Sequence, residues 1–192
     1  MPSHPAPHVE ALPDVASVHA EPPRVLWLTG LSGSGKSTLA CALQGALNEQ
    51  GKRAYTLDGD VVRRGLCRDL GFSPADRSEN IRRIAETARL MCDAGLIVIV
   101  ACISPLNADR EAAKAVIGAE RFLQMYLSTS LQTCELRDVK GLYRQARAGM
   151  IAEFTGISSP YEPPLAPDLT LDTGECTVDA CLAQMLALIK PK

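Results

Sequence analysis

The residues with the clearest chemical meaning are eight consecutive positions, 30–37, which fit the pattern G-x-x-x-x-G-K-[ST]. Glycines in such a loop let the backbone turn tightly and direct successive N–H groups at a phosphate. Lys36 is expected to reach the β- and γ-phosphates and to serve catalysis, and Ser37 to ligate Mg²⁺. The pattern predicts a nucleoside triphosphate, with ATP as the expected co-substrate, and Mg²⁺ as cofactor. Alone it does not separate kinases from GTPases, motor ATPases or mere nucleotide-binding modules. The residues expected to bind ATP are Gly30, Ser32, Gly33, Ser34, Gly35, Lys36, Ser37 and Thr38.

Two carboxylates follow the second apolar run of the chain, as Asp58 and Asp60 in the sequence Leu-Asp-Gly-Asp. Side chains two apart on a strand share a face, so both carboxylates are expected to point at the bound phosphates. In phosphoryl transfer, one carboxylate can hold a Mg²⁺-bound water while the other orients or deprotonates an acceptor hydroxyl. A plain Asp-Gly-Asp turn without a catalytic role is the alternative, and the pair alone does not decide between the two.

Basic residues and one aromatic residue come next along the chain. Guanidinium forks match phosphate geometry with paired donors. Arg63 and Arg77, expected in loops just beyond the acidic pair, are therefore candidate ligands of an anionic second substrate. Solvated surface arginines are the alternative. Phe72 could stack on a base or pack in a core, and taken alone it favours the core.

The composition is that of an ordinary globular protein and narrows the classes of partner. The 192 residues carry a formal net charge of −2, which does not suggest a nucleic-acid partner. The longest apolar run, residues 95–103, is about half the length of a membrane span, and no secretion signal is evident. Neither nucleic acid nor membrane is an expected partner. Seven cysteines without a Cys-x-x-Cys pair indicate reduced thiols in the cytoplasm, although a redox role for one of them stays open.

Two segments differ in composition. Residues 1–23 hold six of the thirteen prolines and all three histidines, which predicts a disordered, Pro-rich N-terminal extension. A metal-binding or partner-binding role is the alternative for this extension. Residues 24–192 are expected to form one P-loop kinase domain. Because they contain no histidine, catalysis by histidine and histidine-ligated metals are excluded there.

Short apolar runs alternate with helical patterns from residue 24 onward, which is typical of units built around a parallel sheet. The expected fold is α/β, a P-loop NTPase-type three-layer fold with a mostly parallel central sheet and helices on both faces. The predicted strands cover residues 25–29, 54–57, 96–102, 122–127 and 169–171, and the predicted helices cover 37–49 and 74–94.

Other classes of P-loop protein agree less well with the sequence. A guanine-reading Asn-Lys-x-Asp is absent, which weakens the GTPase interpretation. The long apolar strand at 96–102 ends in Cys102 instead of the acidic residue typical of ATPase Walker B strands. The carboxylates after the second strand therefore favour a kinase.

Ten short motifs, in this order and spacing, resemble the adenylyl-sulfate kinase family. The resemblance spans almost everything after residue 24, and it rests on the succession of motifs more than on any one of them. In chain order they are GLSGSGKST from Gly30, LDGD from Leu57, RDLGFS from Arg68, DR at Asp76, ENIRRIAE from Glu79, ISP from Ile103, DVKGLY from Asp138, ARAG from Ala146, FTGI from Phe154 and LDTG from Leu171.

The resemblance implies transfer of the ATP γ-phosphoryl group to the 3′-hydroxyl of adenosine 5′-phosphosulfate (APS). The product would be 3′-phosphoadenosine 5′-phosphosulfate, formed in sulfate activation. The resemblance also implies that Arg63, Arg77 and Asn80 bind the phosphosulfate end and that Phe72 and Phe154 sandwich the substrate adenine. Stacking contributes about 1–3 kcal/mol per base. With the resemblance, stacking on the adenine is therefore favoured for Phe72 over packing in a core.

Further roles are implied by the same resemblance. Asp60 is the leading candidate for activating the 3′-hydroxyl, with Asp58 supporting Mg²⁺ or its waters, although the two could be reversed. Lys140 would lie on a mobile segment that closes over both substrates and excludes water. Ile103 and Ser104 would lie near the substrate. Ser104 matches a serine that is phosphorylated in some relatives, although a Ser-Pro turn is a simpler explanation. A homodimer is expected.

The sequence departs from the family pattern at several positions. Val61 follows the acidic pair where the family usually has Asn, Cys67 and Leu106 replace an Asn and an aromatic residue, and Asn107 replaces an Arg. Losing an amide beside the acidic pair removes a group that could position a substrate. Two alternatives therefore stay open: a kinase of the same fold for another nucleotide-like or small hydroxyl acceptor, and a weakly catalytic nucleotide-binding regulatory module.

Overall fold

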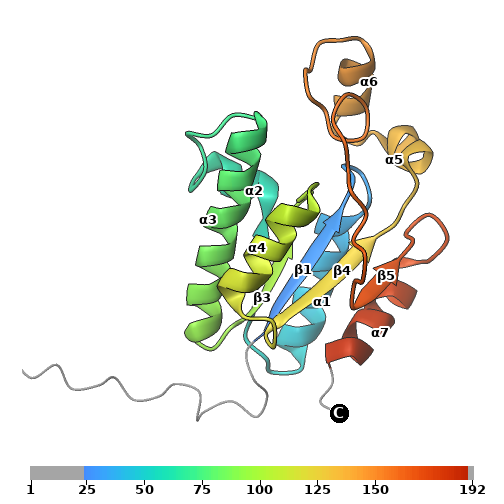
Figure 1. The fold of residues 1–192 in the computed structure, drawn as a ribbon. Coiled ribbons are helices and arrows are strands. Elements are labelled where there is room, and N and C mark those ends of the chain that lie inside the picture. The colour runs from blue at the N-terminus through green and yellow to red at the C-terminus, as the bar shows by residue number, and fades with distance from the viewer. Residues whose placement is uncertain (1–23, 190–192) are drawn as a thin grey trace, which may run out of the picture.

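A five-stranded parallel sheet forms the middle layer of the computed structural model, which describes residues 24–189 (Figure 1). The strands are β1 (Val25–Gly30), β2 (Ala54–Asp58), β3 (Ile97–Ala101), β4 (Phe122–Leu127) and β5 (Leu169–Leu171). The helices are α1 (Lys36–Glu49), α2 (Gly59–Arg64), α3 (Pro74–Asp93), α4 (Asn107–Ile117), α5 (Leu131–Arg137), α6 (Leu142–Arg147) and α7 (Val178–Ile189). This architecture confirms the expected α/β three-layer fold.

The strands follow the order β2-β3-β1-β4-β5, and all neighbouring pairs are parallel. The register aligns Asp58 at the end of β2 with Ala101 at the end of β3, and Ala101 also pairs with Leu28 of β1. The loops that leave these strands therefore emerge at one edge. This carboxyl edge is where open α/β sheets bind ligands, and the glycine loop begins there.

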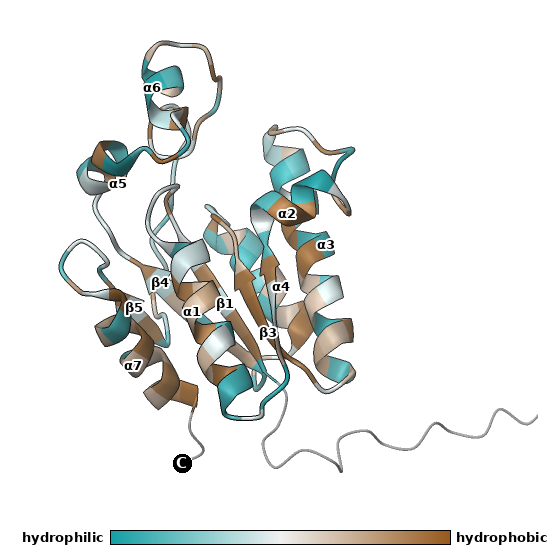
Figure 2. Ribbon diagram, turned by 180° about the vertical axis from the view of Figure 1, so that it is seen from behind, coloured by the Kyte–Doolittle hydropathy of each residue, from teal (hydrophilic) through white to brown (hydrophobic). Residues whose placement is uncertain are grey.

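Side chains alternate between the two faces of the central strand β1 and so contribute to two separate cores. Leu26 and Leu28 belong to the core that includes α1 and α7, whereas Val25 and Trp27 belong to the core that includes α3 and α4. Figure 2 shows α1 and α7 in front of the apolar strands, and Figure 1 shows α3 and α4 on the opposite face. The strand that carries the glycine loop is thus buried on both faces.

The predicted strands and the two longest helices correspond closely to the structure. The helices expected at 37–49 and 74–94 are α1 and α3. Gly51 and Gly95, just after them, have positive φ angles of 75° and 86°, as is common where a helix ends. The strands expected at 122–127 and 169–171 match β4 and β5. The other five helices are not predicted, and three of these, α2, α5 and α6, are six or seven residues long and too short to show a helical period.

Asp58 and Asp60 do not lie on one strand, contrary to the prediction. β2 ends at Asp58, whose carboxylate accepts a hydrogen bond from the Asp60 backbone N–H at 2.8 Å and caps α2. Asp60 lies in the first turn of that helix. Arg63 and Arg77 likewise lie on α2 and α3 instead of in loops. A strand-to-helix turn, not strand alternation, brings the two carboxylates together.

The predicted disordered extension, residues 1–23, lies outside the described residues. Within residues 24–189 no helix has the length and apolar character needed to cross a membrane.

Candidate active site

The glycine loop wraps round the N-terminus of α1. Gly35 caps this helix with a left-handed φ of 91°, a conformation that other residues rarely adopt. Gly30 leaves β1 so close to β4 that an added Cβ would lie 2.7 Å from the Leu127 carbonyl oxygen. Both glycines are therefore required by geometry. The loop presents a helix N-terminus, where backbone N–H groups and the helix dipole favour anions.

Lys36 is folded back onto the loop that contains it. Its Nζ donates to the carbonyl oxygens of Gly30 at 2.9 Å and Leu31 at 2.7 Å and to Ser34 Oγ at 3.3 Å. The residue is only 9% exposed, and burial lowers its pKa from 10.5 to about 8, because desolvation disfavours the ammonium. The ammonium thus has neutral oxygen partners where a phosphate would supply charged ones.

Ser37 and Asp58 place two oxygen ligands side by side. The Ser37 hydroxyl donates to Asp58 Oδ2 at 2.6 Å. Residues 24–189 contain no group of three or more His, Cys, Asp and Glu side chains that could hold a metal. A hydroxyl and one carboxylate nevertheless fit Mg²⁺, because this ion prefers oxygen ligands and usually completes its shell with waters and substrate phosphates.

Asp60 and Lys140 form an ion pair, although they lie 80 residues apart in the sequence. Lys140 belongs to the short connection between α5 and α6. Both side chains are about half exposed, so the pair contributes little to folding stability. Its significance is positional, since it brings the α5–α6 connection over the acidic turn.

Phe72 is not a core residue, because 62% of its surface is exposed. The guanidinium carbon of Arg63 lies 4.4 Å from the centroid of the Phe72 ring, which is a cation–π distance. Arg63 also donates through Nη1 to the Gly71 carbonyl oxygen at 2.8 Å. An exposed aromatic face and a cation therefore stand next to each other on this wall.

Arg77 joins the two segments that carry Phe72 and Phe154. Its Nε donates to the Phe72 carbonyl oxygen at 2.8 Å, Nη1 donates to Thr155 Oγ1, and Nη2 donates to the Glu153 carbonyl oxygen. A guanidinium has five N–H donors, and these bonds use three of them. Arg77 therefore ties the two aromatic segments together, and two of its five donors are not used by these bonds.

Asn80 is 5% exposed, and its Oδ1 has no hydrogen-bond partner. Buried amide oxygens are normally hydrogen-bonded, so this acceptor is available to a donor group of a ligand. Phe154 packs edge-on against Tyr143 with ring centroids 5.0 Å apart. The Tyr143 hydroxyl donates to the Ser32 carbonyl oxygen at 2.8 Å. One side chain thus connects Phe154 to the glycine loop.

One cavity of about 570 Å³ collects these groups. Among the predicted site residues, only Gly30 and Ser34 are not part of its wall, and both are buried in the glycine loop. The predicted residues that line it are Ser32, Gly33, Gly35, Lys36, Ser37, Thr38, Asp58, Asp60, Arg63, Phe72, Arg77, Asn80, Ile103, Ser104, Lys140 and Phe154.

Arg137 and Thr173 also line this cavity and are missed by the sequence analysis. Arg137 donates to the Gly33 carbonyl oxygen at 3.2 Å and to Oγ1 and the carbonyl oxygen of Thr173 at 2.8 and 2.6 Å. Thr173 Oγ1 donates to the Ser34 carbonyl oxygen at 3.0 Å. The two residues therefore brace the glycine loop. The LDTG motif is the only sequence signal for Thr173. Arg137 has none, because α5, which ends at this residue, is too short for its helical period to be recognised.

Ser104 and Cys102 are buried groups of the cavity wall. Trp27 Nε1 donates to Ser104 Oγ at 3.1 Å, and Ser104 is 1% exposed, so phosphorylation of this serine, which stays a prediction, would require its hydroxyl to become accessible. Burial raises the pKa of the Cys102 thiol to about 12. The thiol therefore stays protonated at neutral pH and is a poor nucleophile.

The residues that depart from the family pattern lie away from the cavity wall. Val61 is exposed on α2, Cys67 is buried in the core beside α3, and Leu106 and Asn107 lie at the start of α4. None of the four is among the described residues that line the cavity. Any influence of these substitutions on the acceptor would therefore be indirect.

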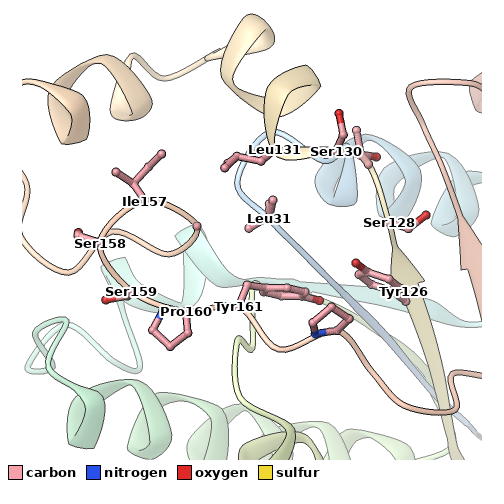
Figure 3. Close-up of a pocket in the computed structure, with 13 residues that line it drawn as sticks. Leu31, Tyr126, Ser128, Ser130, Leu131, Ile157, Ser158, Ser159, Pro160 and Tyr161 are labelled. Atoms are coloured by element: carbon pink, nitrogen blue, oxygen red, sulfur yellow. The ribbon is translucent and has the colours of Figure 1, made fainter.

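A second cavity, also of about 570 Å³, lies between the start of the glycine loop, the end of β4 and residues 156–163 (Figure 3). Its wall consists of hydroxyl-bearing, aromatic and aliphatic side chains, among them Leu31, Tyr126 and Tyr161. No described lining residue is charged. It lacks the cations that a phosphosulfate or a triphosphate needs, so we assign the chemistry to the first cavity.

Comparison with known proteins agrees with this assignment. Residues 22–172 match the family model described as adenylylsulphate kinase. Adenylyl-sulfate kinases from Vibrio cholerae and Prochlorococcus marinus are 56% and 55% identical over 171 and 163 residues. These alignments cover 89% and 85% of this chain and 80% and 81% of the relatives.

A solved structure extends the likeness to three dimensions. The Mycobacterium tuberculosis APS kinase in complex with AMPPNP and APS has a TM-score of 0.85 and is 46% identical, and the match covers 89% of this chain and 99% of that one. The family model and the curated relatives both cover most of this chain. The chain therefore belongs to the adenylylsulphate kinase family.

Proposed function

We propose that this kinase transfers the γ-phosphoryl group of ATP to the 3′-hydroxyl of APS and releases 3′-phosphoadenosine 5′-phosphosulfate and ADP. The observation that carries the proposal is the single cavity that combines a phosphate-binding loop, a carboxylate pair and an exposed aromatic–cationic wall. The first feature suits a triphosphate, the second a hydroxyl acceptor, and the third an adenine with an anionic tail.

On the nucleotide side, the loop N–H groups and Lys36 would bind the phosphates. Lys36 must then exchange its bonds to Gly30, Leu31 and Ser34 for bonds to phosphate oxygens. Ser37 and Asp58 would hold Mg²⁺, and the ion would neutralise charge on the phosphates. Arg137 and Thr173 would keep the loop in position.

On the acceptor side, Asp60 would orient the 3′-hydroxyl and take its proton while the oxygen attacks the γ-phosphorus. Its partner Lys140 would move from the carboxylate towards the transferring phosphoryl group, where an ammonium stabilises negative charge. That exchange of partners would couple closure of the α5–α6 connection to the presence of both substrates.

The far end of the acceptor would be held by aromatic and polar groups. Phe72 and Phe154 would stack on the adenine, and Arg63, Arg77 and Asn80 would bind the phosphosulfate. Asn80 would donate to the phosphosulfate through its amide N–H groups, because phosphosulfate oxygens only accept hydrogen bonds, and its unpartnered Oδ1 would accept from a donor elsewhere on the ligand.

The test is ADP release by the purified protein with MgATP and each of three acceptors: APS, adenosine 5′-monophosphate and gluconate. We expect turnover with APS that exceeds both others at least tenfold. A preference for another acceptor would instead support the second candidate, a kinase of the same fold for another nucleotide-like or small hydroxyl acceptor. Lys36→Ala is the control for contaminating kinases.

The setting of the reaction is also a proposal. We place it in the cytoplasm, within sulfate assimilation, and expect a homodimer. An APS kinase from Thiobacillus denitrificans described as hexameric has a TM-score of 0.67 to this chain at 33% identity, and the match covers 88% of this chain but only 29% of that one. Light scattering of the purified protein would give the oligomeric state.

A further inference from the structure

The turn at Ser104 forms part of the cavity wall in an unusual backbone conformation. Ile103, Ser104 and Pro105 all line the cavity. Ser104 has a positive φ of 40°, which is uncommon for a residue other than glycine. Such a conformation persists where the surrounding structure holds it in place. The groups that hold Ser104 therefore shape this part of the site.

Arg110 of α4 is one such group, beside Trp27 and Thr29, which also donate to Ser104. It is 1% exposed and donates through Nη1 to the Ser104 carbonyl oxygen and through Nη2 to Asn107 Oδ1 and the Glu162 carbonyl oxygen. None of these partners is a carboxylate, and its Nε has no hydrogen-bond partner. The cation thus ties the Ser104 turn to the segment that follows Phe154.

Tyr161 adds a second tie from the same segment. Its hydroxyl lies 2.9 Å from Thr29 Oγ1, which donates to the Ile103 carbonyl oxygen at 2.7 Å. Its ring lies 5.7 Å from the Arg110 guanidinium carbon. Figure 3 shows the ring extending from its loop towards Tyr126, with which it stacks at 6.0 Å. Thr29 directly precedes the glycine loop, so this contact connects three segments of the site.

Stability alone does not explain a buried arginine without a carboxylate partner. Removing a guanidinium from water is costly, and apolar residues of similar volume often serve a core equally well or better. A guanidinium, however, can hold several oxygens in a fixed geometry. The oxygens held here belong to the turn at Ser104, to Asn107 and to the segment after Phe154.

We infer that Arg110 and Tyr161 are positioning residues for the acceptor. They fix the Ser104 turn relative to the segment that carries Phe154. The Ser104 turn and the Phe154 ring can then contact the same APS molecule. Neither residue lines the first cavity, which contains the glycine loop, although Tyr161 lines the second. The inference rests on the proposed function and adds two residues that act through others.

The decisive variant is Tyr161→Phe, which removes only the hydroxyl that contacts Thr29. We expect the KM for APS to rise about two- to tenfold, as the loss of one neutral hydrogen bond allows, with the KM for ATP and the melting temperature nearly unchanged. Tyr126→Phe is the matched control, because Tyr126 stacks on Tyr161 but its hydroxyl is not part of the network. That variant should behave as the wild type.

Arg110→Met removes more of the network and should raise the KM for APS further than Tyr161→Phe does. If the Arg110→Met protein does not fold, Tyr161→Phe alone decides the question. Calorimetric titration with APS separates this inference from the proposed function. A wild type that binds APS without transfer contradicts the function, and the ratio of binding constants between wild type and Tyr161→Phe then decides the inference. Equal binding constants for APS in the wild type and Tyr161→Phe overturn the inference. Equal losses of affinity for APS and for ATP in the variant overturn it as well. A wild type that does not bind APS overturns both.

Discussion

Lys36 provides the sharpest test of how the glycine loop works. Its pKa is lowered to about 8 by burial among neutral oxygens, and a triphosphate beside it would favour the charged form and raise that pKa. Binding of ATP should therefore be accompanied by proton uptake. The affinity for ATP should be highest below the pKa of Lys36 in the free enzyme and should fall as the pH rises through about 8.

The size of the effect follows from that pKa. At pH 9, one unit above it, only about a tenth of the free enzyme carries the ammonium, so ATP should bind about tenfold more weakly than at pH 7. This factor corresponds to about 1.4 kcal/mol. Near pH 8 about half a proton should be taken up per ATP bound.

The assay is calorimetric titration of the enzyme with MgATP at pH 8 in two buffers of different ionisation enthalpy, followed by affinity measurements from pH 7 to 9. Lys36→Met is the control, since it should bind weakly and without the pH dependence. Binding heats that do not depend on the buffer, or an affinity for ATP that is constant up to pH 9, would refute the idea. Lys36 would then not be partly deprotonated before ATP binds.

Three further predictions concern catalysis, recognition and stability. Asp60→Asn should lower kcat by at least about 100-fold, the usual contribution of a general base, while equilibrium binding of ATP is retained. Phe154→Ala should raise the KM for APS about tenfold or more, because one stacking face is lost, as measured by steady-state kinetics. Leu43→Ala should lower the free energy of unfolding by about 2–5 kcal/mol, because Leu43 is fully buried in the core beneath α1, as measured by urea denaturation.

Each of these has an outcome that would count against it. Near-normal kcat in the Asp60 variant would shift the role of base to Asp58 or to solvent. A KM for ATP that rises as much as the KM for APS would place Phe154 outside the acceptor site. Leu136, which is largely exposed, is the control for Leu43: Leu136→Ala should change the free energy of unfolding by less than about 0.5 kcal/mol, and similar losses in both variants would contradict the assigned core.

The fold is predictable from the sequence where apolar patterns are long. α1 and α3 span fourteen and twenty residues and end near glycines, so their period and their boundaries are visible. α7 is twelve residues long but apolar around most of its circumference, and its pattern lacks a polar face that would distinguish it. The short helices α2, α5 and α6 are set by turns and tertiary contacts instead of by periodicity.

The site is predictable where chemistry depends on a fixed local spacing. The glycine loop and the acidic turn are local motifs, and the cavity contains both. Arg137 and Arg110 lie outside any such motif. Their roles arise from hydrogen bonds to carbonyl oxygens distant in the chain, so a local sequence pattern does not predict them. The ion pair of Asp60 with Lys140 spans 80 residues, and only the family resemblance placed Lys140 near the substrates.

The most direct test of the central claim is to identify the product. The purified enzyme with MgATP and APS should form a nucleotide with a new phosphate on the 3′-hydroxyl, detected by ³¹P NMR and mass spectrometry, in amounts equal to the ADP released. The Asp60→Asn enzyme should form at least about 100-fold less of it in the same time while still binding ATP. Binding of ATP and APS by the wild type without this product, or ADP release without phosphorylated APS, would contradict the claim.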